Sequence, residues 1–228
     1  MPHPARRTVL SLLGVGLLTA CGGAPPVLAP TGVDGLQIPT PSPRPGDFVD
    51  TIDNPWLAYE PGITWTYDVT ANDAERVVVN IEPGEARQGV PTTALVSTAY
   101  DGADRRLWVV RDLLAQDRDG NVWWCGREVS GRPPAGMESS EANDGFGLWM
   151  PRALRLGDGF VVRPGQEIAN VAETGVAVKT WMADFEGAVE LRVDVSGRSE
   201  SRAYVEGVGL VARSGGLWGD WSLRARAR

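Results

Sequence analysis

Apolar and polar residues alternate along many short segments of this chain, and the alternation predicts β-strands. The clearest segment is 63–70, where every second residue is apolar, which is the period of a strand with one buried face. The dipeptide Pro61-Gly62 marks the start of that strand. The same pattern predicts further strands over 76–82, 92–100, 107–115, 122–125, 159–163, 168–171, 175–181, 189–195, 202–205, 210–213 and 217–223.

Helical periodicity is missing from the same pattern. No stretch places apolar residues at positions i, i+3, i+4 and i+7 over three turns. Many short strands separated by glycine-containing turns favour an all-β domain with an antiparallel sandwich or barrel. Residues 130–150 are the exception, and their composition predicts one long loop.

Residues 117–128, DRDGNVWWCGRE, have acidic residues and Asn at the spacing of a calcium-binding loop. A helix–loop–helix calcium loop needs glycine at its sixth position and a helix on each side. Here the sixth position is Val122, and both flanks have the pattern of strands. Asp119, Gly120 and Asn121 are instead the residue types of a tight hairpin turn. The sequence therefore predicts a β-hairpin with these three residues at its tip, and no metal site.

The first 21 residues have the features of an exported lipoprotein. A short basic start precedes an apolar run at 8–18 that is too short to anchor the chain across a bilayer. Leu18-Thr19-Ala20-Cys21 follows and resembles the lipobox of bacterial lipoproteins. That resemblance implies cleavage before Cys21 and a diacyl anchor on its thiol, with chains such as palmitate. An ordinary secretory signal is the alternative, and Arg6-Arg7 leaves export by the twin-arginine or the general route open.

The chain divides into three parts. Residues 1–20 are the predicted signal peptide, and 21–46 are the lipidated cysteine with a linker. That linker contains seven prolines, which favours a disordered, extended tether. Residues 47–228 are long enough for one β domain with a sizeable core.

Removal of the signal peptide narrows the chemistry that the chain can perform. The single histidine is His3, so the processed chain cannot build a Ser-His-Asp, Cys-His or histidine-ligated metal site. With Cys21 acylated, Cys125 is the last thiol, which excludes an internal disulfide. Loss of Arg6 and Arg7 takes the net charge from −7 to −9, which argues against a nucleic-acid partner. No cofactor is predicted.

Three motifs resemble those of a group of uncharacterised bacterial secreted proteins and lipoproteins. The hairpin is similar to their AQDxDGNVWYxGE motif, and the chain departs from that pattern at Cys125 and at Arg127, which precedes Glu128. The other two motifs, NPY…PGxxWxY and YYAPGVGLV, match in order and spacing over about residues 53–214. Their counterparts here are Asn54-Pro55-Trp56, Pro61-Gly62, Trp65 and Tyr67, and then Tyr204 to Val211.

This resemblance implies a curved, mostly antiparallel sheet, a half-barrel or open barrel similar to periplasmic lipoprotein-carrier (LolA-like) proteins. The group brings no assigned catalytic residues. A concave apolar face on such a sheet could hold a lipid or another apolar ligand. The candidates to line it are Trp65, Trp108, Trp123 and Trp181, although tryptophans on strands also serve simply to fill a core.

We therefore predict a lipoprotein of the cell envelope, held on a bacterial membrane by its lipid, with its domain outside the cytoplasm. The domain is predicted to be a non-enzymatic binding or carrier module for an apolar envelope ligand. The alternative is a structural domain or one that binds an envelope protein. A hydrolase that uses carboxylates, for example Glu138, Glu141 or Asp144 of the long loop, is less favoured. That chemistry needs two carboxylates at a specific separation, which a sequence cannot show. A deep apolar cavity would separate the first possibility from the second.

Overall fold

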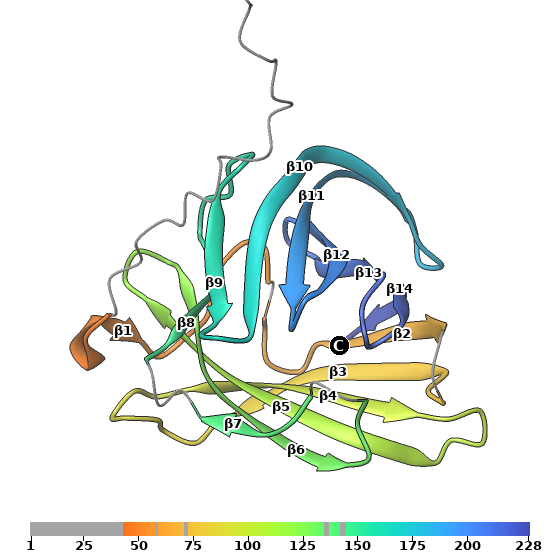
Figure 1. Ribbon diagram of the computed structural model, residues 1–228, viewed down its shortest axis with the longest axis horizontal. Coiled ribbons are helices and arrows are strands. Elements are labelled where there is room, and N and C mark those ends of the chain that lie inside the picture. The colour runs from red at the N-terminus through yellow and green to blue at the C-terminus, as the bar shows by residue number, and fades with distance from the viewer. Residues whose placement is uncertain (1–42, 58, 71–72, 135–136, 142–144) are drawn as a thin grey trace, which may run out of the picture.

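The computed structural model describes residues 43–228 except 58, 71–72, 135–136 and 142–144 (Figure 1). The predicted signal peptide, Cys21 and most of the linker lie outside these residues. One short 3-10 turn, Pro45–Asp47, precedes the strands. Among the described residues no helix has the length and apolar character needed to cross a membrane.

All the remaining regular structure is β-strand. In chain order the strands are β1 (Phe48–Val49), β2 (Thr64–Thr70), β3 (Arg76–Pro83), β4 (Thr93–Tyr100), β5 (Arg106–Asp117), β6 (Val122–Gly131), β7 (Ser140–Glu141), β8 (Gly147–Met150), β9 (Gly159–Arg163), β10 (Glu167–Lys179), β11 (Asp184–Val195), β12 (Arg198–Val205), β13 (Gly209–Ser214) and β14 (Asp220–Ala227).

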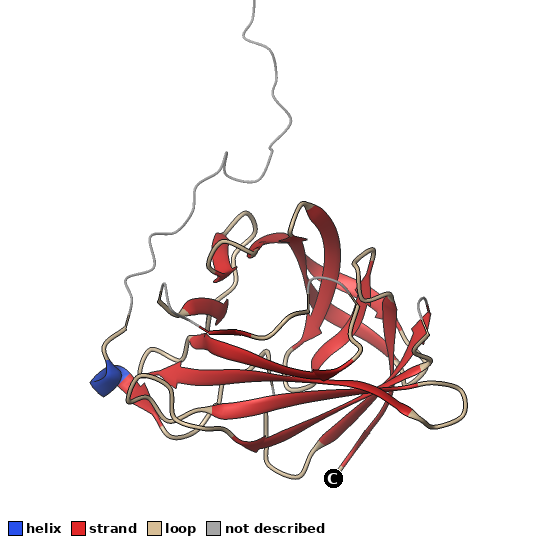
Figure 2. Ribbon diagram, turned by 60° about the horizontal axis from the view of Figure 1, so that its bottom comes forward, coloured by secondary structure: helices blue, strands red, loops and turns tan. Residues whose placement is uncertain are grey.

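Twelve of these strands form one continuous antiparallel sheet, in the order β7-β6-β5-β4-β3-β2-β14-β13-β12-β11-β10-β9. Each pair of neighbours in this order is also consecutive along the chain, except β2 and β14, whose pairing joins the two ends of the domain. The sheet curves round on itself into a nearly closed barrel (Figures 1 and 2). The prediction of an all-β, curved antiparallel sheet is confirmed.

The barrel is completed by a short strand, β8, at the seam between its two edges. β8 pairs with β6 through Val122↔Met150 and Trp123↔Leu148. On its other side Gly147 lies against the backbone carbonyl of Val162 in β9, and a Cβ at this position would collide with that carbonyl. The missing side chain therefore lets β8 approach β9 closely.

Several predicted strand boundaries are wrong: the strands predicted over 122–125, 189–195 and 202–205 are longer, and the last strand runs over 220–227 rather than 217–223. Two regions differ more. The region 130–150 is not one loop, because β6 continues to Gly131 and the region also contains β7 and β8. The predicted strands 168–171 and 175–181 are one bent strand, β10, whose register shifts between Val171 and Glu173 and again near Gly175. β10 ends at Lys179, so Trp181 lies in the turn that follows rather than on a strand.

The hairpin predicted from DRDGNVWWCGRE is confirmed, with β5 entering and β6 leaving it. Gly120 has a φ of 85°, a conformation that glycine adopts at little cost. The Asp117 carboxylate accepts hydrogen bonds from the Asn121 backbone N–H at 2.9 Å and from the Trp123 indole N–H at 2.8 Å. This carboxylate therefore stabilises the turn from within the protein.

Three segments that the sequence singled out as motifs, 54–57, the hairpin tip and the start of 204–211, meet at this end of the barrel. Asn54 is 1% exposed, and its Nδ2 donates to the Gly120 carbonyl at 2.9 Å while its Oδ1 accepts from the Trp56 backbone N–H at 3.0 Å. The next residue, Pro55, accepts a hydrogen bond from the Gly207 backbone N–H at 2.8 Å. The segment 54–57 thus joins the hairpin tip to the β12–β13 turn, which is a structural role.

Replacement of Asn54 tests this role. We expect Asn54→Ala to lower the free energy of unfolding by about 2–3 kcal/mol, because it leaves the buried Gly120 carbonyl without its donor and removes the cap on Trp56. Urea denaturation followed by tryptophan fluorescence measures the loss. Asn80→Ala is the matched control, because the Asn80 side chain is half-buried and donates to the Glu82 side chain at 3.0 Å. Equal effects of the two substitutions would contradict the assignment.

Candidate functional site

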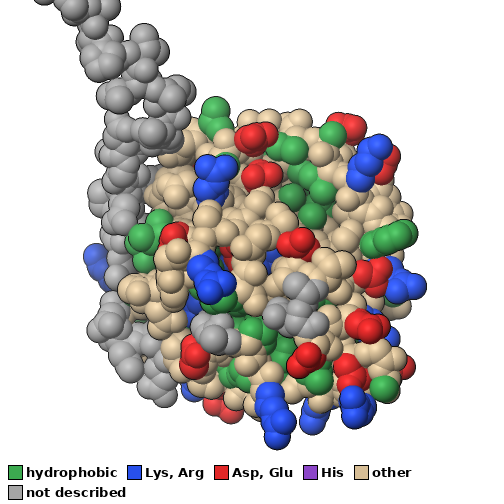
Figure 3. Space-filling model, turned by 45° about the vertical axis from the view of Figure 1, so that its right-hand side comes forward, with side chains coloured by type: hydrophobic (Ala, Val, Ile, Leu, Met, Phe, Trp, Pro, Cys, Tyr) green, Lys and Arg blue, Asp and Glu red, His purple; other side chains and the backbone are tan. Residues whose placement is uncertain are grey.

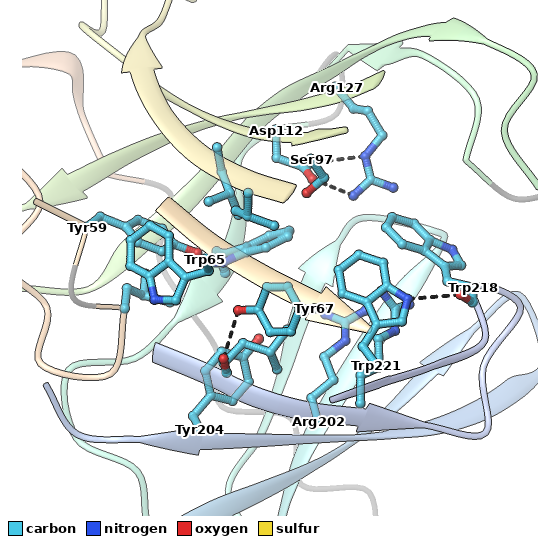
Figure 4. A pocket seen from close by; sticks show the side chains of 16 residues that line it. Tyr59, Trp65, Tyr67, Ser97, Asp112, Arg127, Arg202, Tyr204, Trp218 and Trp221 are labelled. Carbon is cyan, nitrogen blue, oxygen red and sulfur yellow. Dashed lines mark hydrogen bonds and ion pairs between the residues drawn. The ribbon is translucent and has the colours of Figure 1, made fainter. Parts of the chain in front are cut away.

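A cavity of about 60 Å³ lies inside the barrel (Figure 4). Much of its wall is aromatic, from β2, β8, β12, β14 and the loops that precede β2 and β14. The aromatic residues that line it are Tyr59, Trp65, Tyr67, Trp149, Tyr204, Trp218 and Trp221.

Charged side chains complete the wall, and they occupy inward-facing positions of the strands. Asp112 lies between the buried Val110 and Leu114 of β5, so its carboxylate faces the barrel interior. Its partner across the ladder is Arg127 of β6. The Arg127 Nε and Nη2 atoms donate to the two Asp112 oxygens at 2.7 and 2.8 Å, a two-pronged ion pair.

A second set of ion pairs runs through β10, β12 and β13. Arg202 contacts two carboxylates at 2.5 Å each, Glu167 through Nη2 and Glu200 through Nε. Beyond them, Arg163 contacts Glu167 at 2.6 Å and Arg213 contacts Glu200 at 2.5 Å. Arginines and carboxylates therefore alternate along a continuous chain of contacts in the interior.

We call these seven residues the buried ionic cluster: Asp112, Arg127, Arg163, Glu167, Glu200, Arg202 and Arg213. Each is at most 8% exposed. Four arginines face three carboxylates, which leaves one excess positive charge in a region shielded from water. Removing charges from water is costly, and a hydrophobic filling is often at least as stable, so stability alone gives little reason for such a cluster.

The charges within the cluster fix its protonation. Burial alone would raise the pKa of Glu167, but Arg202 and Arg163 outweigh burial and lower that pKa to about 2. Glu200 also has a lowered pKa, since Arg202 and Arg213 outweigh the effect of burial. Burial lowers the pKa of Arg213 to about 10, a value at which the guanidinium is still charged at neutral pH. Both glutamates and Arg213 are therefore ionised under ordinary conditions.

Three hydrogen-bond donors on the cavity wall have no acceptor among the described residues. Two of them, called here the two free donors, are Nη1 of Arg127, a residue 4% exposed, and the indole Nε1 of Trp218, a residue 7% exposed; the third is the indole Nε1 of Trp149, a residue 9% exposed. The Trp218 ring stacks against arginines, with its centroid 5.1 Å from the Arg127 guanidinium and 4.1 Å from that of Arg213. The two free donors thus belong to neighbouring side chains on one part of the wall (Figure 4).

The four tryptophans that the sequence singled out lie in different places. Trp65 lines the cavity, and its indole N–H donates to the Val208 carbonyl at 2.9 Å. Trp108 is buried on β5 beside Trp218, with ring centroids 6.3 Å apart, but it is not part of the cavity wall. Trp123 is buried, and its indole binds Asp117. Trp181 is 76% exposed at the tip of the β10–β11 hairpin.

The other predicted positions lie away from the cavity. The hairpin tip, Asp119 to Asn121, packs against the Asn54 segment instead. Cys21 and Asp144 lie outside the described residues. The sequence analysis missed the buried ionic cluster, although Glu200, Arg202 and Tyr204 alternate at period two, which places three polar groups on one face of β12.

Cys125 is buried on β6, as its place in an apolar strand predicts, and burial raises the pKa of its thiol to about 12. We expect its alkylation in a Cys21→Ser variant to be at least about a hundredfold slower in the folded protein than in concentrated guanidinium chloride. Iodoacetamide labelling followed by mass spectrometry measures both rates. Comparable rates would contradict the burial of this strand.

Catalytic carboxylates are not favoured by this arrangement. A general acid needs a raised pKa, whereas the pKa values of Glu167 and Glu200 are lowered by their arginine partners. The third interior carboxylate, Asp112, is held on both oxygens by Arg127. In the part of the chain that the structure describes, no group of three or more His, Cys, Asp or Glu residues could hold a metal ion.

Comparison with known proteins was made at three levels. No family model, no curated protein and no solved structure matches this chain. The resemblance of the three motifs to bacterial secreted proteins therefore stays a prediction, and the interpretation of the cavity depends on its own geometry.

Proposed function

We propose that this chain is a lipid-anchored protein of the cell envelope whose β domain is a non-enzymatic binding module for a small ligand. The observation that carries the proposal is the cavity inside the barrel, which combines an aromatic wall with three buried donors that lack acceptors among the described residues. Structures normally satisfy buried polar groups, and exceptions indicate a missing partner or a functional role. A ligand is such a partner.

The size and the lining of the cavity favour a different class of ligand from the apolar ligand that the sequence predicts. Pockets for drug-sized molecules measure roughly 300–1,000 Å³, and this cavity measures about 60 Å³. A lipid chain does not fit that space without movement of the wall. Three arginines and Asp112 among the lining residues also favour a ligand with a polar end over a purely apolar one. We therefore propose a compact amphipathic ligand in place of a lipid.

We further propose that the domain is attached to a membrane through the N-terminal segment. The lipobox supports an anchor at Cys21 in a bacterial membrane, with the proline-rich linker as the spacer. The face of the domain in Figure 3 carries acidic and basic side chains interspersed, without the basic stripe that nucleic-acid binding requires. We propose that the domain lies outside the cytoplasm and that its partner is a small molecule.

A protein-interaction domain is the second candidate. The nearly filled interior supports it, since a carrier of large ligands needs a larger cavity. Trp181 and Met182 at the tip of the β10–β11 hairpin are also 76% and 43% exposed, and exposed apolar side chains are common at protein contacts.

Native mass spectrometry of the detergent-solubilised full-length protein tests the first candidate. We expect a small-molecule adduct that is lost on denaturation. Ser97→Leu should abolish it, because Ser97 is a cavity residue on β4 and the larger side chain fills the space. Thr98→Leu, at the next and half-buried position of the same strand, should retain it. A wild-type protein with no adduct, or an adduct that Ser97→Leu leaves in place, would favour the interaction domain.

A further inference from the structure

We propose that the ligand in the barrel carries a carboxylate, which accepts hydrogen bonds from Arg127 Nη1 and Trp218 Nε1. The inference rests on the proposed function and adds the chemical class of the ligand. Three independent features support it: the charge of the buried ionic cluster, the two unsatisfied donors, and the volume of the cavity.

The charge of the interior calls for one more anion. In the buried ionic cluster, Glu200 is shared by Arg202 and Arg213, and Glu167 is shared by Arg163 and Arg202. Asp112 and Arg127 form a neutral pair, so the excess lies on the three arginines that share the two glutamates; one of these, Arg213, packs 4.1 Å from the centroid of the Trp218 ring. The cluster therefore carries one excess positive charge among the described residues, in a region where an uncompensated charge is costly. A bound monoanion would bring the cluster to neutrality.

The free donors show where the anion binds. Asp112 occupies Nε and Nη2 of Arg127, so Nη1 is the guanidinium nitrogen left to bind a ligand. The Trp218 ring lies 5.1 Å from the same guanidinium, and its indole N–H is the second free donor. A carboxylate has two oxygens, each able to accept from one of these donors. Charge-assisted hydrogen bonds of this kind are about twice as strong as neutral ones.

The cavity favours a short carboxylate over a phosphate. A cavity of about 60 Å³ is far smaller than a pocket for a drug-sized molecule, which favours a carboxylate with a chain of a few carbons. The two free donors beside each other, Arg127 Nη1 and Trp218 Nε1, match the two oxygens of a carboxylate, whereas a phosphate has more oxygens to satisfy. The rest of the wall includes the aromatic rings of Trp65 and Tyr204, which suit a short apolar body. Propionate, with five non-hydrogen atoms, is therefore a suitable probe.

Calorimetric titration of the full-length protein with propionate and with propionamide tests the proposal. The two probes have the same shape and differ in charge. We expect propionate to bind at least about tenfold more tightly, because only it accepts at both donors and neutralises the cluster. Inorganic phosphate serves as a second anion, and we expect it to bind more weakly than propionate.

Two variants and one control locate the site. Arg127→Gln should reduce propionate affinity by about tenfold or more. Since this change also leaves Asp112 unpaired, Trp218→Phe provides a milder test that keeps an aromatic ring beside Arg213 and removes the indole donor together with part of the ring. It should weaken propionate by about fivefold and weaken propionamide less. Arg111→Gln is the control, because Arg111 lies on β5 with its Nη1 paired to Glu82 at 2.5 Å, away from the cavity wall.

The outcomes separate this inference from the proposed function. Equal binding of propionate and propionamide, with no effect of Trp218→Phe, would overturn the carboxylate and leave a neutral-ligand module. Tighter binding of phosphate would overturn the carboxylate class. Absence of binding by all three probes, beside a denaturable adduct in native mass spectrometry that lacks an acidic group, would also overturn it, while the binding function itself would stand.

Discussion

Glu167→Gln should destabilise the domain by about 3–5 kcal/mol, the cost typical of breaking a buried ion pair on one side. Glu167 is 2% exposed and contacts Arg163 at 2.6 Å and Arg202 at 2.5 Å. The amide keeps the shape of the side chain but leaves both guanidinium groups less compensated away from water. Urea denaturation at neutral pH measures the difference from the wild type. Glu186→Gln, on the exposed part of β11, should leave the free energy of unfolding unchanged.

Ionisation of Glu167 should also make the free energy of unfolding depend on pH. The folded-state pKa of Glu167 is about 2 and its ordinary value is 4.5, so the folded state favours the ionised form. Its contribution is fully present above about pH 4.5 and is lost as the pH falls toward 2. The difference corresponds to roughly 3 kcal/mol. Glu167→Gln should therefore flatten the stability curve over this range, and an unchanged slope would contradict the assignment.

Gly147→Ala should open the seam of the barrel and lower the free energy of unfolding by about 3 kcal/mol. A methyl group at this position collides with the Val162 backbone carbonyl, which cannot rotate away as a flexible side chain would, so β8 and β9 must separate. Hydrogen exchange should then show faster exchange of the β9 amides, while those of β3 and β4 keep their rates.

Gly46→Ala is the control for this steric argument. A Cβ at Gly46 meets no atom within 4 Å, so the substitution should have little effect on stability or on exchange. A Gly147→Ala protein as stable as the wild type, with unchanged exchange in β9, would show that β8 does not close the barrel by direct backbone contact.

Local chemistry allowed the fold class to be predicted from the sequence. The alternation over 63–70 and the Asp119-Gly120-Asn121 turn are properties of a few adjacent residues, and both the strand and the hairpin are present. The region 130–150 failed because β7 and β8 have only two and four residues. Pairing with β6, rather than any local preference, makes such short segments strands.

The candidate site could be predicted only in part. Trp65 was selected as a large apolar side chain on a strand and does line the cavity. Asp112 and Arg127 were missed because adjacent charges usually indicate a solvated face. Which face of β5 points inward is decided by closure of the barrel, a long-range event that no window of sequence contains. The charged interior was therefore harder to predict than the apolar one.

The attachment of the first strand has a mechanical consequence. β1 has two residues, paired with Gln116 and Asp117 at the end of β5, and the next contacts are the hydrogen bonds between Asp53 and the Gln116 side chain. A force applied through the N-terminal segment would load these few bonds first and then the Asn54 junction. The strands that surround the cavity would carry tension only after these contacts had broken, so a pull on the N-terminal segment would reach the cavity last.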